Sequence, residues 1–315
     1  MTQRNFLLRR LGQSALVLLM VIILVFVILH VIPGNAALTR MGEHASRETL
    51  ERTMEEQGLN RSVFEQFFRY LGDLFRGELG MSTSMGRSVG RLILTAWGNT
   101  LVLALGAAMV SWTLGLACGI LSARWKDSVL DRLFMGFSLL GLSMPVFLVA
   151  MGLQYVLAYH LHWLPIAGTE DWRGFILPSL ALGWNHAGSI ARLVRSSLTD
   201  TLEEDYIDTA LAKGRGKMGV LWFHALRNTF LPVVTMMAIQ LSSLLSGVVI
   251  TETVFSINGI GRLAVQAIGG RDAPLLQGTV LFSTILVILG SLASDLLCAC
   301  LDPRTRKEVR PGGLS

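Results

Sequence analysis

Hydrophobic residues occur in six long runs along this chain, and shorter polar segments separate them. The runs are residues 11–32, 100–121, 133–159, 174–191, 228–250 and 273–301. A helix needs about 20 predominantly apolar residues to cross a bilayer. The pattern therefore predicts an all-α protein with six membrane-spanning helices. The fourth run is the weakest, because Pro178, Asn185 and His186 interrupt it.

Two features inside the runs predict how the helices bend and pack. Pro145 lies in the third run, and a proline inside a helix removes a backbone hydrogen bond and kinks or breaks the helix. Gly115 and Gly119 are four residues apart in the second run, a spacing that lets another helix approach closely. We expect a break near Pro145 and a tight helix contact at the two glycines.

The first run has basic residues in front of it and small residues behind it, as a cleaved signal peptide does. Its apolar core is about 21 residues long, however, whereas that of a signal peptide has about 7–15. We therefore expect a retained transmembrane helix.

Basic residues are distributed unevenly between the segments that join the runs. Of the 27 Lys and Arg residues, 16 lie in the segments 1–10, 124–132, 192–227 and 302–315. The short segments on the other side hold only Arg173, Arg262 and Arg271. Because Lys and Arg favour the cytoplasmic side of a membrane, we expect both termini in the cytoplasm.

This topology divides the chain into four parts. Residues 1–32 form a cytoplasmic stub and the first transmembrane helix, and residues 33–92 form an external helical loop. Residues 93–301 form the transmembrane core with a cytoplasmic coupling loop at 192–227, and residues 302–315 form a cytoplasmic tail. Two segments of the external loop are predicted to be helical. One has the pattern of a capped short helix at Ser46-Arg47-Glu48-Thr49. The other has apolar residues at helical spacing, namely Val63, Phe64, Phe67, Phe68 and Leu71.

Composition agrees with a membrane protein. Hydrophobic residues make up 52% of the chain and charged residues only 16%, against about 25% in soluble domains. The net charge of +5 does not indicate nucleic-acid binding, because the basic residues lie between hydrophobic runs and are not interleaved with aromatic residues. The three cysteines include no C-x-x-C pair, and we expect buried thiols.

The segment EEDYIDTALAKGRGKMG, residues 203–219, is unusually charged for its surroundings. Acidic residues at its start and basic residues at its end complement a helix dipole, and Gly214 is placed to end the helix. Thr201 and Glu204 have the spacing of a capping box. The segment predicts a short helix at about 201–214, whose apolar face contains Ile207, Ala210, Leu211 and Gly214. From the pattern alone, this helix either rests on its own transmembrane bundle or docks on a partner.

Residues 205–214, 224–228 and the pair Leu231-Pro232 resemble the permease subunits of ATP-binding-cassette importers, most closely the dipeptide, oligopeptide and nickel branch. In that family a motif that begins Glu-Ala-Ala and continues to a glycine forms a coupling helix, which sits in a groove of a cytoplasmic ATPase. Its positions match Asp208, Thr209, Ala210 and Gly214 here, with Asp in place of Glu and Thr in place of the first Ala. By this resemblance the coupling residues are Glu204, Tyr206, Ile207, Asp208, Thr209, Ala210, Leu211 and Gly214.

Further short matches to the family lie along almost the whole chain. They are residues 9–34, 77–82, 143–147, 163–165, 252–261, 271–274 and 302–304. Asn258 stands where the family usually has proline, which bears on the rigidity of that turn. The order and spacing of the matches imply the type I ABC importer permease fold.

The resemblance also implies partners and a location. The partners are a second homologous permease subunit, two cytoplasmic ATPase subunits and an external substrate-binding protein, and the assembly lies in the bacterial inner membrane. ATP and Mg would be bound by the ATPases and not by this chain. In agreement, Gly216-Lys217 is followed by Met218, not by the Ser or Thr of a phosphate-binding loop. We therefore expect a non-catalytic transport subunit without its own cofactor.

Polar residues within the runs are candidates for the transport path, because such residues usually face a cavity or a neighbouring helix. They are Asn185, Ser189, Gln240, Ser243, Ser246 and Asp295, with His186 and Ser242 beside them. For the serines, hydrogen bonding between helices is the competing interpretation. For Asp295, the competing interpretation is an ion pair with a basic loop residue.

The substrate and the general class stay open at this point. Short peptides are the first expectation for the substrate, and nickel or a metal–chelator complex is the second. We expect no metal site on this chain, since His160 and His162 would diverge on a helix. A stand-alone channel or secondary transporter is the alternative of another class. An intramembrane enzyme is disfavoured, because the chain has neither H-E-x-x-H nor G-x-S-x-G.

Overall fold

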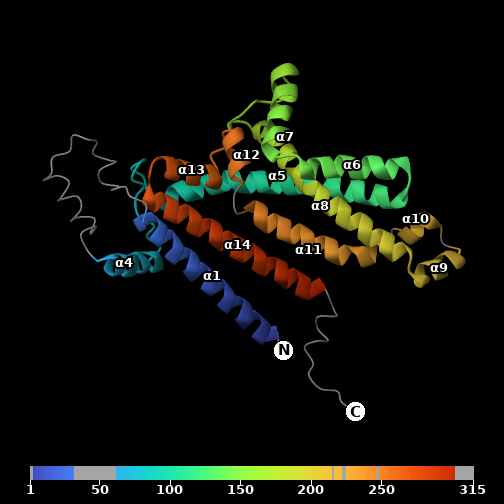
Figure 1. Ribbon diagram of the computed structural model, residues 1–315, viewed down its shortest axis with the longest axis horizontal. Helices are drawn as coiled ribbons and strands as arrows, with labels where there is room; N and C mark the ends of the chain where they lie inside the picture. Colours follow the sequence, from blue (N-terminus) through green and yellow to red (C-terminus); the bar gives the residue numbers. More distant parts are fainter. Residues whose placement is uncertain (1–2, 32–61, 215, 222–224, 246–247, 302–315) are drawn as a thin grey trace, which may run out of the picture.

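The computed structural model describes residues 3–31, 62–214, 216–221, 225–245 and 248–301. This part of the chain is helical, and it contains no strand beyond a single isolated bridge between Met81 and Ser88. The long helices are α1 (Gln3–Val31), α5 (Val89–Arg124), α6 (Val129–Ser143), α8 (Ile176–Leu202), α11 (Leu226–Leu245) and α14 (Ala273–Leu301). The shorter ones are α4 (Val63–Phe75), α7 (Val146–Leu153), η1 (Gln154–His160), η2 (Trp172–Phe175), α9 (Asp205–Ala212), α10 (Lys217–Val220), α12 (Val249–Val254) and α13 (Ile260–Gly269). Figure 1 shows their arrangement.

Each of the six hydrophobic runs forms helix. Within the described residues, α1, α5 and α14 are long and apolar enough to cross a membrane, and the bent pair formed by 129–143 and 146–160 makes a fourth span if its two halves are taken as one. The apolar part of α11 is shorter, at Thr229–Leu245. Helix α8 corresponds to the weak fourth run and mixes polar with apolar residues along its length.

The third run breaks at Pro145, as predicted. Helix α6 ends at Ser143, Pro145 precedes the first residue of α7, and the two halves meet at 105°. The amide of Asn185 on α8 donates hydrogen bonds to the carbonyls of Gly141 and Met144, at 2.9 and 3.3 Å. These bonds satisfy backbone groups that the end of α6 leaves without helical partners.

Helices α5 and α8 pack closely along small residues, which confirms the predicted contact at the two glycines. A Cβ atom on Gly115 would lie 2.7 Å from Cβ of Ile190. On Gly119 it would lie 2.7 Å from both the carbonyl oxygen of Ala191 and Cβ of Val194. Side chains at these positions would hold the two helices apart, so only glycine permits the observed approach.

Helix α8 continues well beyond the predicted end of the fourth run at Ala191 and stops at Leu202. The prediction ended the helix where charged residues begin. However, Ile190, Val194 and Leu198 recur every four residues and are all buried, so one face keeps packing after the sequence becomes polar. The first part of the predicted cytoplasmic segment 192–227 is therefore helical, and the chain leaves α8 at Leu202.

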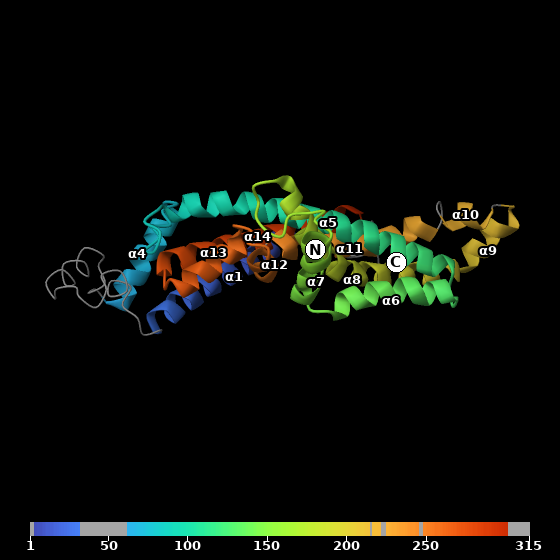
Figure 2. The ribbon, with the colours of Figure 1, turned by 90° about the horizontal axis from the view of Figure 1, so that it is seen from above.

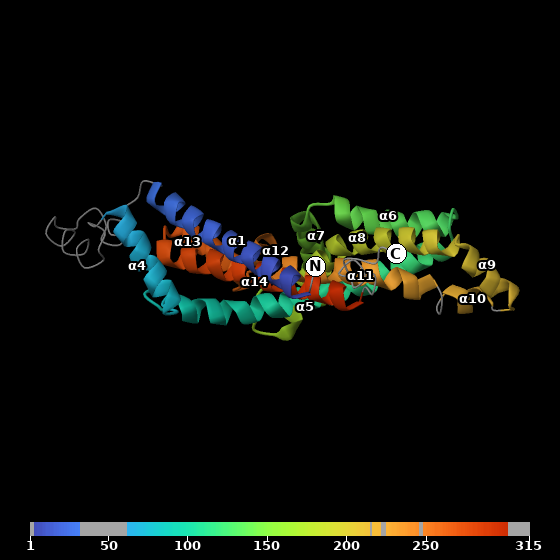
Figure 3. The same cartoon turned by 90° about the horizontal axis from the view of Figure 1, so that it is seen from below.

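The two ends of the molecule carry different elements. Figures 2 and 3 show α4 and α13 at one end and α9 and α10 at the other. The N-terminal end of α1 and the C-terminal end of α14 point away from α4, toward the end that carries α9. Helix α4 forms where helical spacing was predicted, and the Ser62 hydroxyl caps it by accepting a hydrogen bond from the Glu65 amide at 3.3 Å. The short helix predicted at 46–49 lies outside the described residues.

A buried carboxylate organises the turn before α13. Glu252 is fully buried and accepts hydrogen bonds from the Thr100 hydroxyl at 2.7 Å and from the Arg262 amide at 2.9 Å. The Thr100 oxygen also accepts the amide of Ile260, at 2.9 Å. The Asn258 side chain accepts from Arg262 at 3.2 Å. Side-chain hydrogen bonds therefore hold this turn, which contains Asn258 where the permease family usually has proline.

Asp272 forms a second buried clamp at the same end. Its carboxylate accepts hydrogen bonds from the hydroxyls of Ser82 and Ser84, at 2.6 and 2.7 Å, and from the Ser84 amide at 2.9 Å. Burial alone would raise the pKa of Asp272, but the hydrogen bonds outweigh it and lower the pKa to about 2. The clamp fixes the loop before α5 to the start of α14.

The Asp272 clamp predicts a pH-dependent stability. A carboxyl whose pKa is lowered by folding contributes stability above its unfolded pKa, about 4, and loses that contribution as the pH falls toward 2. We expect Asp272→Asn to lower the melting temperature of the purified protein at pH 7. The melting temperature of this variant should also fall less than that of the wild type between pH 5 and pH 3. Thermal unfolding at several pH values measures this. Asp171→Asn, at an exposed position, is the control, and an equal pH dependence in wild type and Asp272→Asn would contradict the prediction.

Candidate coupling site

Helix α9 is anchored to the bundle by one apolar side chain. Ile207 is 2% exposed and belongs to a hydrophobic cluster with Leu198 of α8, Val220 of α10 and Val233 of α11. Ala210 is half-buried against the same cluster. Ile207 and Ala210 of the predicted apolar face thus lie against a hydrophobic cluster to which α8, α10 and α11 contribute, while Gly214 is exposed.

The opposite face of α9 is open. Glu204, Asp205, Tyr206, Asp208 and Thr209 are all exposed. The acidic residues lie at or before the first turn of the helix, where the dipole favours negative charge. A helix that is anchored on one side and exposes a polar face on the other is suited to contact a second protein. The two interpretations that the pattern left open, resting on the bundle and facing a partner, are therefore compatible.

The predicted start of this helix is wrong, and its end is right. Thr201 does not cap a helix, because it lies in the last turn of α8 and its hydroxyl donates to the Ser197 carbonyl at 2.7 Å. The chain turns at Glu203 and Glu204, and α9 covers Asp205–Ala212 only. Gly214 has a φ of 83°, the left-handed conformation in which glycine commonly follows a helix end. Leu211 lies within α9, as predicted.

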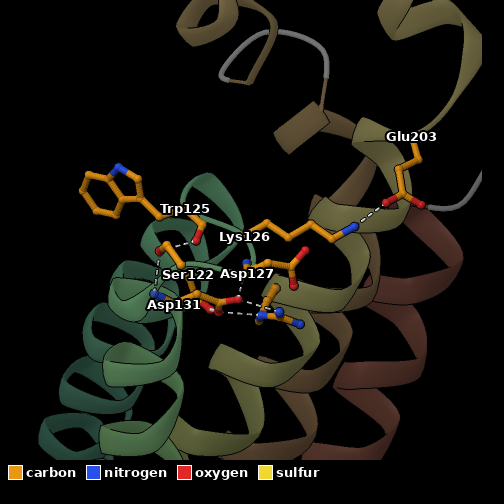
Figure 4. Close-up of polar contacts among 8 residues, drawn as sticks. Ser122, Trp125, Lys126, Asp127, Asp131 and Glu203 are labelled. Carbon is orange, nitrogen blue, oxygen red and sulfur yellow. Dashed lines mark hydrogen bonds and ion pairs between the residues drawn. The ribbon is translucent and has the colours of Figure 1, made fainter.

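A buried ion pair ties α8 to α6 close to this helix. Arg195 donates two hydrogen bonds to the carboxylate of Asp131, at 2.8 and 2.7 Å. The Ser122 hydroxyl of α5 and the Asp127 amide also donate to Asp131. Asp131 is buried, and its charge is balanced by the partly exposed guanidinium of Arg195. Figure 4 shows these groups between α5, α6 and α8.

A second ion pair lies at the junction between α8 and α9. Lys126, in the loop between α5 and α6, contacts the carboxylate of Glu203, and this hydrogen bond raises the pKa of Lys126. Both side chains are exposed, so the pair is worth little for stability. Its position still links the turn before α9 to the α5–α6 loop (Figure 4).

Neither ion pair was predicted from the sequence. One local signal was present, because Ser128 and Asp131 have the spacing of an N-terminal helix cap, and the Asp131 amide donates to the Ser128 hydroxyl at 3.2 Å. The partner Arg195 is 64 positions away, and no pattern in the sequence connects the two residues.

The difference between the two pairs gives a testable expectation. Arg195→Ala should destabilise the protein by about 3 kcal/mol, because it leaves the Asp131 carboxylate buried without its counter-charge. Lys126→Ala should change stability little, because both of its charges are hydrated. Thermal unfolding of the two purified variants measures the difference. Equal melting temperatures for Arg195→Ala and wild type would show that Asp131 does not depend on Arg195.

The candidate path residues fall into two groups. Gln240 is buried, accepts a hydrogen bond from the Ser111 hydroxyl at 3.3 Å and donates to the His186 carbonyl at 3.0 Å. Its amide therefore joins α5, α8 and α11, in the manner of a packing residue. Ser243 is exposed and Ser189 is half-buried. Ser246 lies outside the described residues.

Asp295 forms an ion pair, as the alternative to a path role predicted, but its partner lies in a helix and not in a loop. Its carboxylate lies 3.2 Å from the guanidinium of Arg10 on α1. The pair joins the two helices that carry the ends of the chain. Among the described residues, no group of three or more His, Cys, Asp or Glu side chains could hold a metal ion.

An all-helical membrane bundle with a short helix seated outside its spans is the architecture of a multi-pass transport subunit. The chain belongs to the family of binding-protein-dependent transport system inner membrane components, whose family model matches residues 115–307. The model of the N-terminal part of these membrane components matches residues 3–91. The protein is thus a non-catalytic permease subunit of an ABC importer of the peptide and nickel type, located in the inner membrane.

Individual relatives support the same assignment. The glutathione transport system permease protein GsiC of Escherichia coli O6:H1 is 37% identical over 302 residues, which cover 96% of this chain and 99% of that protein. GsiC of Shigella flexneri serotype 5b is 36% identical with the same coverage. A chain of the inward-facing MetNI methionine ABC transporter matches with a TM-score of 0.58 and 18% identity, covering 67% of this chain and 96% of that chain. At this identity the match shows the fold alone.

Proposed function

We propose that this chain forms half of the translocation path of an ATP-driven importer for short peptides, and that α9 couples it to cytoplasmic ATPases. The observation that carries the proposal is the placement of α9, which buries Ile207 in the bundle and exposes Asp208 and Thr209. In this arrangement the α9 end is cytoplasmic, as the distribution of Lys and Arg predicts.

Coupling requires that movement of α9 reaches the spans. The ATPases bind ATP with Mg, close on it and displace α9. Ile207 is buried in a hydrophobic cluster to which α8, α10 and α11 contribute, and movement of α9 reaches the bundle through this cluster. The Glu203–Lys126 and Arg195–Asp131 pairs extend the movement to the α5–α6 loop and to α6. Such a switch changes access only if ATP binding favours one state over the other by several kcal/mol.

The proposed path lies between this chain and the second permease subunit. A side chain that lines it must be open in the isolated chain, a condition that Ser243 meets and the buried Gln240 does not. The hydrogen bond from Gln240 to the His186 carbonyl brings this part of α11 beside α8, where Asn185 and Ser189 lie. We propose Ser243, Ser189 and Asn185 as path residues.

Short peptides are the proposed substrate class because similarity to the glutathione permeases extends over 96% of the chain. The test is to purify the external binding protein of this importer and identify its bound ligand by mass spectrometry. Uptake of that ligand is then measured in proteoliposomes with both permeases, with and without the ATPases. We expect a peptide of a few residues and uptake only with the ATPases and ATP. Uptake without the ATPases would overturn the coupling role, and nickel or a metal–chelator complex as the ligand would overturn the substrate class.

A further inference from the structure

Helix α4 carries aromatic side chains that the rest of the chain leaves uncovered. Phe64, Phe68 and Phe75 are 79%, 68% and 90% exposed. At about 100° of rotation per residue, the three side chains fall within about 40° of one another on the helix. We call them the outer stripe. Exposed clusters of this kind mark contact with a protein or a membrane.

The outer stripe is one of three sectors around α4. The neighbouring sector contains Phe67 and Tyr70, whose rings pack on Phe26 of α1 with centroid distances of 5.1 and 6.1 Å. The sector on the far side is polar and includes the exposed Arg69 and Arg76 as well as the acidic Glu65 and Asp73. The contact with α1 therefore covers only part of the apolar surface of α4. The outer stripe is the part that this contact leaves uncovered.

The contact with Phe26 fixes the place of α4 along α1. The membrane-length apolar segment of α1 is Arg9–Ile28, so Phe26 lies about 3 Å along the helix axis from its end, at 1.5 Å per residue. The exposed side chains of Leu24 and Val27 surround this part of α1 with apolar surface. Through Phe67 and Tyr70, α4 therefore lies beside the end of this apolar segment, which in a spanning helix is the level of the lipid headgroups. Figures 1 and 3 show α4 at this end of α1, opposite α9.

We propose that α4 is an interfacial helix, with its outer stripe inserted into the bilayer and Arg69 and Arg76 facing the lipid phosphates. Helices with aromatic residues on one face and basic residues on the other lie in the plane of the interface in this way. Insertion of α4 requires only that α1 spans the membrane. The assignment of α4 to the outer leaflet rests on the orientation given in the proposed function.

Photo-crosslinking distinguishes lipid from a protein partner as the occupant. The assembled importer is placed in nanodiscs with p-benzoylphenylalanine at position 68, and in a matched control at position 69, an exposed position about 100° away on the polar sector. We expect a lipid adduct, detected as added mass on the α4 peptide, at position 68 and not at 69. An adduct between position 68 and the binding protein or the second permease, or equal lipid adducts at both positions, would overturn the proposal.

A second measurement covers the case in which the photoprobe gives no adduct. Phe68→Cys and Arg69→Cys are labelled in nanodiscs with a charged maleimide, and the wild-type chain gives the background from its own three cysteines. We expect Phe68→Cys to react about tenfold more slowly, because its thiol is inserted below the headgroups. Equal rates would refute insertion. ATP-driven uptake is measured on the same samples, so a failure of this proposal is distinguishable from a failure of the transport function.

Discussion

ATP-driven uptake is expected to be lost when Asp208→Arg and Gly214→Trp are combined in this chain. Both positions are exposed, and nothing lies within 4 Å of a Cβ atom on Gly214. The changes therefore leave the bundle contacts of α9 intact, since these are made through Ile207. They reverse a charge and add a large ring on the surface proposed to enter the ATPase groove. Uptake in proteoliposomes and co-purification of the ATPases are the two measurements.

The matched control is Glu170→Arg, which makes the same charge change at an exposed position between η1 and η2. Because α9 is untouched, this variant should transport normally. The double variant should lose only about 1–2 kcal/mol of unfolding free energy, the cost of a bulky residue in a left-handed conformation. Its melting temperature should therefore stay close to that of the wild type. Normal uptake, or normal ATPase binding by the double variant, would remove α9 from the coupling role.

The second large effect is expected from Gly119→Leu on α5. A side chain there would overlap the carbonyl of Ala191 and Cβ of Val194, and the backbone of α8 cannot yield without breaking its own packing. Overpacking of this kind costs about 1–3 kcal/mol or more, so we expect a sharp loss of folded protein in the membrane. The measurement is the yield of monodisperse protein after extraction, together with its melting temperature.

Gly98→Leu is the control for this change. Gly98 lies on the same helix, and a Cβ atom there meets nothing within 4 Å, so it gains helix propensity without a clash. The two variants make the same chemical change on one helix and differ in what the new side chain meets. If Gly119→Leu were as stable as Gly98→Leu, the close packing of α5 on α8 would not be a determinant of the fold.

The sequence alone predicted the features that depend on local chemistry. The hydrophobic runs located the helices, because each span must bury its own backbone hydrogen bonds in an apolar environment. Pro145 located the break in the third run, because the missing amide and the ring act on the residues next to them. Gly115 and Gly119 located the tight contact on α5, although the pattern did not say that α8 would fill it.

The tertiary structure decided where α8 ends and what surrounds α9. Thr201 and Glu204 satisfy the spacing of a capping box, yet α8 continues through Thr201, because Val194 and Leu198 still pack against the bundle. The pairing of Asp131 with Arg195 and the burial of Ile207 join residues distant in sequence. Periodicity and capping act within one or two helical turns, so they locate helices. Tertiary contacts between helices decide two other features: which charges neutralise one another, and which face of α9 stays open.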